Sequence, residues 1–149
     1  MSDKEWMALA VETAKTAPEA DMPVGALLVC DGKIEARAVN RARTDDDPTA
    51  HAEMLALREG ARALGSSRLN DCTLYVTLEP CPMCAAAIVT ARVGRVVYGA
   101  ADAKAGCCGS VADLTDHWFL HSIRTVGGIL EAECAKLLSD FFSTKRCNF

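Results

Sequence analysis

The sequence predicts an α/β protein in which a mixed five-stranded sheet lies between two layers of helices, a three-layer α/β/α sandwich. Helical patterns of apolar residues alternate with short, β-branched runs of strand length. A hairpin signal joins the first two strand-like runs, whereas most later runs are separated by helices. With 149 residues, 50% of them hydrophobic, the chain is expected to form one domain, residues 1–149, with a substantial core.

The first part of the chain is predicted to form a helix followed by a β-hairpin. Ser2-Asp3-Lys4-Glu5 has the form of a capping box, so a helix is expected to begin there. Residues 24–30 and 33–39 are predicted strands, joined by the hairpin signal Asp31-Gly32. Asn40 follows the second strand, where its side chain could bond its own turn or project an amide into a site. The residues alone favour the turn.

The second helix is expected to begin shortly after Pro48. Proline disfavours helix for the residue before it, and Thr49 is the predicted N-cap. His51 and Glu53 then fall in the first turn of this helix. Gly65 is expected to end it.

The third helix is expected to follow a strand at the centre of the sheet. Residues 72–78 are almost all apolar or β-branched, which indicates a strand buried on both faces. Pro82 suits the first helical position, so Cys81 becomes the N-cap and Cys84 lies within the first turn. Both sulfurs can then reach one metal ion, and the positive end of the helix dipole favours their thiolate forms.

The remaining third of the chain predicts two strands, a long loop and a helix. Residues 95–100 and 123–126 are the predicted strands, and residues 131–145 form the predicted last helix. Residues 101–122 are loop-like. Loops of this length in compact domains are usually functional.

Three residues have the types and spacing of a metal site. His51, Cys81 and Cys84 offer one imidazole and two thiolates, a set that suits zinc, and we expect one ion per chain. Three protein ligands leave the fourth tetrahedral position to water, as in catalytic zinc sites. Glu53 lies two residues after His51 and so need not share its direction, which fits a proton carrier better than a ligand.

These residues together form a known signature. A lone Cys-x-x-Cys is more often a structural half-site or a redox pair, and a lone histidine is usually an ordinary side chain. The combination of His-x-Glu with Pro-Cys-x-x-Cys, however, is the established signature of zinc nucleobase deaminases. In that chemistry zinc lowers the pKa of a bound water from 15.7 to about 7, and the glutamate moves protons.

Charge and composition narrow the function further. The net charge is −4, so any binding of nucleic acid must use a local basic patch. The sequence has no apolar run of membrane-spanning length, and acidic residues rather than a basic region stand near its beginning. We therefore expect a cytoplasmic protein with no membrane association. The eight cysteines are expected to be reduced, with Cys30 and Cys72 as small core residues.

Longer motifs beyond the zinc signature cover nearly the whole chain. They are Met22-Pro23-Val24-Gly25-Ala26, Asp47-Pro48-Thr49-Ala50-His51-Ala52-Glu53, Leu74-Tyr75-Val76-Thr77-Leu78-Glu79-Pro80-Cys81-Pro82-Met83-Cys84, Gly94-Arg95-Val96-Val97-Tyr98-Gly99-Ala100, Asp102-Ala103-Lys104 and Leu137-Leu138-Ser139-Asp140-Phe141-Phe142. With these motifs the chain resembles the cytidine deaminase superfamily and, within it, the bacterial tRNA-specific adenosine deaminases.

The resemblance implies a cytidine deaminase-like fold and an enzyme that converts the wobble adenosine of a tRNA anticodon loop to inosine. It implies that His51, Cys81 and Cys84 hold zinc and that Glu53 shuttles protons. It also implies that Asn40 bonds the adenine, which overrides the turn favoured by the residues alone. The remaining substrate contacts implied are Pro23, Val24 and Ala52 in the base pocket and Asp102, Lys104 and Phe142 toward the RNA. Members of the family act as homodimers.

Two alternatives compete with this hypothesis. The first is deamination of a free nucleobase or nucleoside of the guanine or cytosine type, which the acidic charge favours slightly. The second is a zinc-stabilised binding module without catalysis, which needs a fourth protein ligand from His117, His121 or the Cys107-Cys108 pair. If the substrate is RNA, the local cations are expected at Lys104, Lys145 and Arg146.

Overall fold

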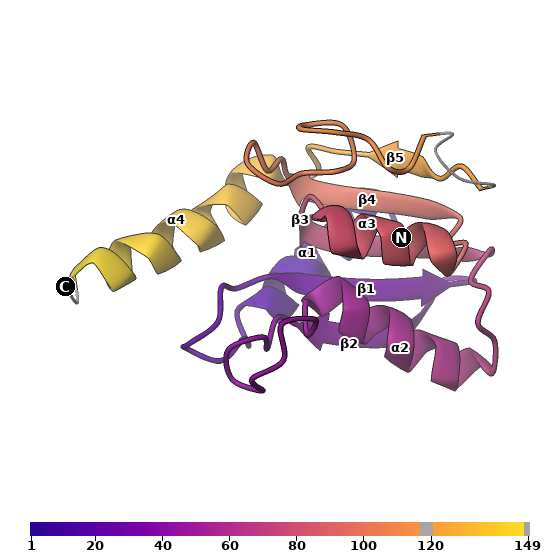
Figure 1. Cartoon of the computed structure of the whole chain (residues 1–149), viewed down its shortest axis with the longest axis horizontal. Helices are drawn as coiled ribbons and strands as arrows, with labels where there is room; N and C mark the ends of the chain where they lie inside the picture. The colour runs from indigo at the N-terminus through magenta and orange to yellow at the C-terminus, as the bar shows by residue number, and fades with distance from the viewer. Residues whose placement is uncertain (117–120, 148–149) are drawn as a thin grey trace.

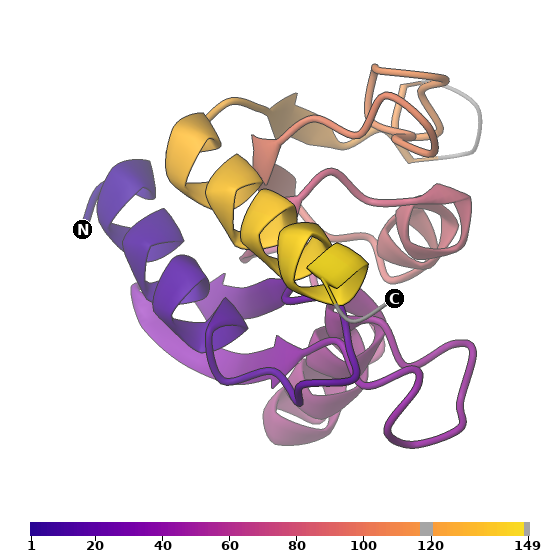
Figure 2. The same ribbon diagram turned by 90° about the vertical axis from the view of Figure 1, so that its left-hand side faces the viewer.

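The sheet lies between two helical layers, as predicted. The computed structural model describes residues 1–116 and 121–147. Helices α1 (Asp3–Ala14) and α4 (Glu131–Cys147) cover one face of the sheet, and α2 (Ala52–Leu64) and α3 (Pro82–Thr90) cover the other (Figures 1 and 2). His117, a candidate fourth zinc ligand, and the side chain of Arg146 lie outside the described residues.

The five strands form one mixed sheet in the order β2-β1-β3-β4-β5. The central strand β3 (Cys72–Leu78) pairs antiparallel with β1 (Gly25–Cys30) and parallel with β4 (Arg95–Ala100). At the edges, β2 (Lys33–Val39) runs antiparallel to β1, and β5 (Arg124–Val126) runs parallel to β4. This arrangement confirms the predicted mixed sheet of a cytidine deaminase-like fold.

Alternate residues of the central strands supply two cores, one on each face. In β1, Leu28 packs with the α2 and α3 side, whereas Leu27 packs with the α1 and α4 side. In β4, Val96 and Val97 divide in the same way, and all four of these side chains are fully buried. Strands buried on both faces read as continuous apolar runs. The continuous apolar run of residues 72–78 therefore indicated the centre of the sheet.

Several local signals form the predicted structures. The Ser2 side chain accepts a hydrogen bond from the Glu5 amide at 3.2 Å and caps α1. Asp31 and Gly32 both have positive φ, as a tight hairpin turn requires. Gly65 ends α2 in the left-handed conformation, at φ 64°.

The predicted N-cap of α2 is wrong. The cap is His51, and α2 begins at Ala52, with Glu53 in its first turn. Thr49 is bound instead to Asp47, whose carboxylate accepts hydrogen bonds from the Thr49 amide at 2.9 Å and the Thr49 hydroxyl at 2.7 Å. The aspartate before Pro48 thus fixes a local turn that delays the helix by two residues.

The expectation that every cysteine is reduced is also wrong. Cys30 and Cys72 are core residues, as predicted, but their sulfurs form a disulfide. They lie directly opposite each other on β1 and β3, with Cα atoms 4.4 Å apart. Strand register brings them within disulfide range, and register between distant strands is not visible in local sequence patterns.

A partly exposed ion pair holds α1 against the sheet. Asp3, in the first turn of α1, accepts hydrogen bonds from two Arg95 nitrogens at 2.7 and 2.8 Å and from the Tyr75 hydroxyl at 2.7 Å. The hydrogen bond with Arg95 is the main reason that the pKa of Asp3 is lowered.

Among the described residues, no helix combines the length and apolar character needed to cross a membrane.

Candidate metal centre and catalytic pocket

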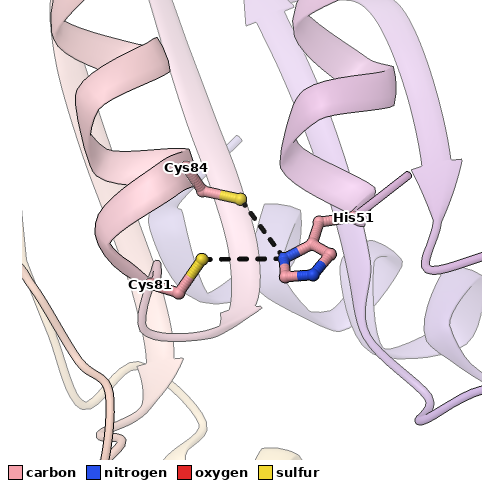
Figure 3. Close-up of side chains that lie close together, drawn as sticks. All are labelled: His51, Cys81 and Cys84. Atoms are coloured by element: carbon pink, nitrogen blue, oxygen red, sulfur yellow. Dashed lines mark hydrogen bonds between the residues drawn. The ribbon is translucent and has the colours of Figure 1, made fainter. Parts of the chain in front are cut away.

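The predicted zinc ligands come together at the N-termini of two neighbouring helices. His51 is the N-cap of α2, Cys81 is the N-cap of α3, and Cys84 lies in the first turn of α3. Figure 3 shows the histidine ring and the two sulfurs facing one another. Nδ1 of His51 is 3.6 Å from Sγ of Cys81 and 3.5 Å from Sγ of Cys84.

These separations fit a tetrahedral zinc ion. Zinc binds sulfur at about 2.3 Å and histidine nitrogen at about 2.0–2.1 Å, so two such ligands on tetrahedral directions lie roughly 3.5–3.6 Å apart. In the described part of the chain, His51, Cys81 and Cys84 form the one group of metal-binding side chains whose ligand atoms lie close enough to share an ion. The arrangement therefore fits zinc with a fourth position left for water.

The helix caps explain why these side chains are free to bind a metal. An N-cap side chain normally accepts a hydrogen bond from its own helix, but His51 and Cys81 make no such bond. Pro82 occupies the start of α3, where its missing N–H has no cost. Two helix N-termini meet at the site, and both favour negative charge there.

The pKa values of the two thiols are shifted in opposite directions. The hydrogen bond with Cys84 lowers the pKa of Cys81 to about 4. The same bond, together with burial, raises the pKa of Cys84. A hydrogen bond with Cys81 raises the pKa of His51. Zinc binds neutral imidazole and thiolate, so metal uptake must release the protons that these groups share.

Glu53 is a buried carboxyl beside the metal centre. Its side chain is 5% exposed, and burial raises its pKa from 4.5 to about 7. A carboxyl with a pKa near neutrality can both accept and donate a proton at physiological pH. This environment suits proton transfer.

A cavity of about 220 Å³ opens over this carboxyl. Its volume is below the roughly 300–1,000 Å³ of sites for drug-sized ligands, so it suits one flat ring system. Four of the residues implied as substrate contacts line it, namely Val24, Asn40, Ala52 and Asp102. It is also lined by residues not singled out as contacts from the sequence, namely Met22, Leu78, Glu79 and Ala105.

The other implied contacts lie outside this cavity. Pro23 is half-buried between two lining residues, and Lys104 is exposed on the loop after β4. Phe142 is 47% exposed and lines a neighbouring cavity of about 530 Å³. Met22 and Asn40 line both cavities, which are therefore adjacent.

Asn40 bonds its own turn and also lines the cavity. Its Oδ1 accepts a hydrogen bond from the Ala42 amide at 3.2 Å, which is the predicted turn. Its Nδ2 donates to the Met22 carbonyl at 3.2 Å. These bonds leave one N–H and one lone pair of the amide for a ligand in the cavity.

Of the alternative fourth ligands, the two that lie within the described residues, His121 and the Cys107-Cys108 pair, do not join the metal group. Nε2 of His121 lies 3.3 Å from the Val93 carbonyl oxygen. Cys107 and Cys108 are buried, and burial raises the pKa of both thiols, that of Cys108 to about 12. Within the described residues, the metal group keeps three protein ligands. This disfavours a closed structural zinc site.

Sequence reasoning also missed a basic surface. Four arginines line a hollow of about 620 Å³ between β2 and α2, namely Arg37, Arg41, Arg58 and Arg62. Arg58 and Arg62 are exposed on α2. They come close to Arg37 and Arg41 because α2 packs across β2. The sequence pattern does not specify this packing.

The open metal centre, the carboxyl beside it and the sheet that carries both are typical of one class, the zinc-dependent deaminases. The family model for the cytidine and deoxycytidylate deaminase zinc-binding region matches residues 1–100. The chain belongs to this family, and zinc is its cofactor.

Known relatives sharpen this assignment. The tRNA-specific adenosine deaminase of Bacillus subtilis (strain 168) is 49% identical over 146 residues, which cover 97% of this chain and 91% of that protein. A solved structure from studies of A-to-I editing by tRNA:A34 deaminases matches with a TM-score of 0.85 and 45% identity, covering 90% of this chain and 99% of that one. A guanine deaminase structure from Bacillus subtilis matches with a TM-score of 0.65 and 43% identity, covering 68% and 66%.

Proposed function

We propose that this protein is a tRNA-specific adenosine deaminase, which hydrolyses adenosine to inosine at the wobble position of an anticodon loop. The observation that carries this function is the 49% identity to a tRNA-specific adenosine deaminase across 97% of the chain. The similarity to a guanine deaminase reaches 68% of the chain. Deamination of a free base is therefore the less favoured alternative.

The reaction replaces the amino group on C6 of adenine with oxygen from water and releases ammonia. His51, Cys81 and Cys84 hold the zinc ion, which when bound supplies an activated water at neutral pH. Glu53 takes a proton from the attacking water and delivers it to N1 of the ring. It then carries the second proton of that water to the amino group, which departs as ammonia and leaves the water oxygen on C6. Its pKa of about 7 suits both transfers.

The walls of the cavity orient the base. Val24 and Ala52 are buried apolar residues that flank the ring, and Pro23 shapes the segment between Met22 and Val24. The free N–H and lone pair of Asn40 are available to the edge of the adenine. Small apolar walls with one amide favour a flat heterocycle with a polar edge.

The RNA outside the pocket is held by local cations on an acidic chain. Lys104 is exposed on the loop whose Asp102 lines the pocket, and Lys145 lines the neighbouring cavity together with Phe142. Exposed aromatic rings stack on unpaired bases, which suits Phe142 to a nucleotide beside the flipped adenosine. The hollow lined by four arginines gives a further surface for phosphates.

The assembly and location follow from the same function. We take residues 1–149 as a single catalytic domain, since one sheet supports both cores. We assign the protein to the cytoplasm, where its proposed tRNA substrate is used. We also assign it as a homodimer, as the family resemblance implies. Sedimentation of the purified protein tests the oligomeric state.

A substrate panel tests the proposed function. The protein would be incubated with an anticodon stem-loop, adenosine, guanine and cytosine, and ammonia release would be measured. We expect kcat/KM for the stem-loop to exceed that for adenosine by orders of magnitude, and to fall as salt rises because phosphates are bound by cations. Equal rates on adenosine and stem-loop, or turnover of guanine alone, would replace this function with free-base deamination.

A further inference from the structure

Glu79 is a buried carboxylate that the reaction does not use. It follows β3, lies two residues before Cys81 and is 2% exposed. Three backbone amides of a single loop donate hydrogen bonds to it, from Asp102 at 3.1 Å, Cys108 at 3.0 Å and Ser110 at 3.0 Å. The Ser110 hydroxyl donates a fourth. One side chain therefore satisfies four donors that lie 23 to 31 residues away in the chain.

The loop of residues 101–110 is folded closely around this carboxylate. A Cβ atom on Gly106 would lie 2.4 Å from the carboxyl carbon of Glu79 and 2.5 Å from the Asp102 carbonyl oxygen. Only glycine permits this approach. The Cys107 amide also donates to the Pro80 carbonyl at 2.8 Å, which ties the loop to the segment that leads into Cys81.

The same loop forms one wall of the catalytic cavity. Asp102 and Ala105 line it, next to Glu79 itself. The Asp102 carboxylate accepts hydrogen bonds from the amides of Lys104 at 2.9 Å and Ala105 at 3.1 Å, so this turn has a defined internal structure. Its position relative to Glu53 across the cavity depends on the hydrogen bonds that Glu79 accepts.

We propose that Glu79 is a positioning residue for substrate binding, whose carboxylate holds the loop of residues 101–110 in place as a preformed wall of the pocket. A wall that is ordered before binding adds no ordering cost when the substrate enters. Glu79 touches neither the metal group nor the reacting atoms in this scheme. Its contribution should appear in KM and leave kcat unchanged. The identity of the substrate rests on the proposed function, but the anchoring of the loop does not.

Two substitutions weaken the contact between Glu79 and the loop, one by changing the carboxylate and the other by changing the loop. Glu79→Gln keeps the size of the side chain but replaces one acceptor oxygen with an NH2 group, which would face donors already directed at that position. Gly106→Ala leaves the carboxylate intact and displaces the loop through the new Cβ atom. Val111→Ser is the matched control, because Val111 is 57% exposed and directly follows this loop.

The first measurement is steady-state kinetics with an anticodon stem-loop, together with zinc content. Losing about one hydrogen bond to a charged group predicts that Glu79→Gln raises KM roughly tenfold, with kcat within about threefold of the original. Gly106→Ala should do the same, and the double variant should be little worse than either single one because both act on one contact. Val111→Ser should leave KM unchanged.

The second measurement needs no substrate. Amide hydrogen exchange should become faster at residues 102, 108 and 110 in Glu79→Gln and remain slow in Val111→Ser. Unchanged exchange would overturn the proposal. So would a Glu79→Gln variant with a lower melting temperature but an unchanged KM, or one that loses kcat in proportion to zinc. If the original protein fails to deaminate the stem-loop, the proposed function is wrong, and the exchange result still decides the role of Glu79.

Discussion

The two faces of the sheet shift the pKa of a carboxyl group in opposite directions. On the α1 side, the hydrogen bond from Arg95 lowers the pKa of Asp3. On the α2 and α3 side, burial raises the pKa of Glu53 to about 7. The carboxylate form of Asp3 is therefore stabilised, whereas that of Glu53 is destabilised. The first face therefore gains stability from its charge, whereas the second keeps a group that is costly for folding and useful for proton transfer.

The largest expected effect comes from removing a metal ligand on the catalytic face. Cys84→Ala removes one of the three ligands, so the variant should lose zinc and show no measurable turnover. Its melting temperature should fall as well, because metal binding contributes to folding. Metal analysis and thermal unfolding check this result. A variant that keeps one zinc per chain would show that Cys84 is not a ligand.

Removing the proton carrier should lower turnover without removing the metal. Glu53→Gln should lower kcat by roughly 10²–10⁴-fold or more, since general acid–base catalysis alone contributes about that much and Glu53 acts twice. Zinc content should stay at one ion per chain. Loss of zinc in this variant would make Glu53 a ligand and contradict the proton-transfer role.

The same substitution should reveal the stability cost of the buried carboxyl. In metal-free protein the pKa of Glu53 in the folded state is about 7, above its ordinary value of 4.5, so between these pH values the folded state keeps a proton that the unfolded state loses. Stability should therefore fall as pH rises from about 4.5 to 7. Glu53→Gln should unfold like the original protein at pH 4 but be more stable at pH 8, by roughly 1–3 kcal/mol. Urea denaturation at both pH values measures the difference, and an equal difference at each pH would contradict it.

A substitution on the α1 face should have the smallest effect. Its effect on stability should depend on pH in the opposite direction from that of Glu53→Gln. Asp3→Asn should lower stability by about 1–2 kcal/mol, because it weakens a partly exposed ion pair that has two hydrogen bonds. The pKa of Asp3 is lowered, so this contribution is present above pH 3.8 and is lost as pH falls below it. Activity should be unchanged. A large fall in kcat would mean that the two faces are not separate in function.

The α3 end of the site was predictable because Pro82 restricts its own position to the start of a helix, which placed Cys81 and Cys84 beside it. The metal group was predictable because His-x-Glu and Pro-Cys-x-x-Cys together form a known signature, and the strands of the sheet were predictable from their apolar runs. The cap of α2 was misplaced at Thr49 because the Thr49 amide and hydroxyl both donate hydrogen bonds to Asp47, two residues earlier.

Features that depend on distant pairing could not be predicted. The Cys30–Cys72 disulfide results from strand register across 42 residues. The four donors to Glu79 come from a loop without regular periodicity, so nothing near Glu79 in the sequence indicates its role. Asn40 was predicted to bond its turn or to face the site, and it does bond its turn and line the pocket. Sequence patterns thus identified the metal-binding group, whereas the shape of the pocket depends on tertiary packing.

The most direct test of a single catalytic zinc on the α2 and α3 face is a zinc titration of metal-stripped protein. Inosine formation on an anticodon stem-loop would be followed as zinc is added in substoichiometric steps. Activity should be absent at the start, rise linearly and reach its plateau at one zinc per chain. Full activity in the stripped protein, or a plateau at any other ratio, would contradict a single catalytic zinc held by His51, Cys81 and Cys84.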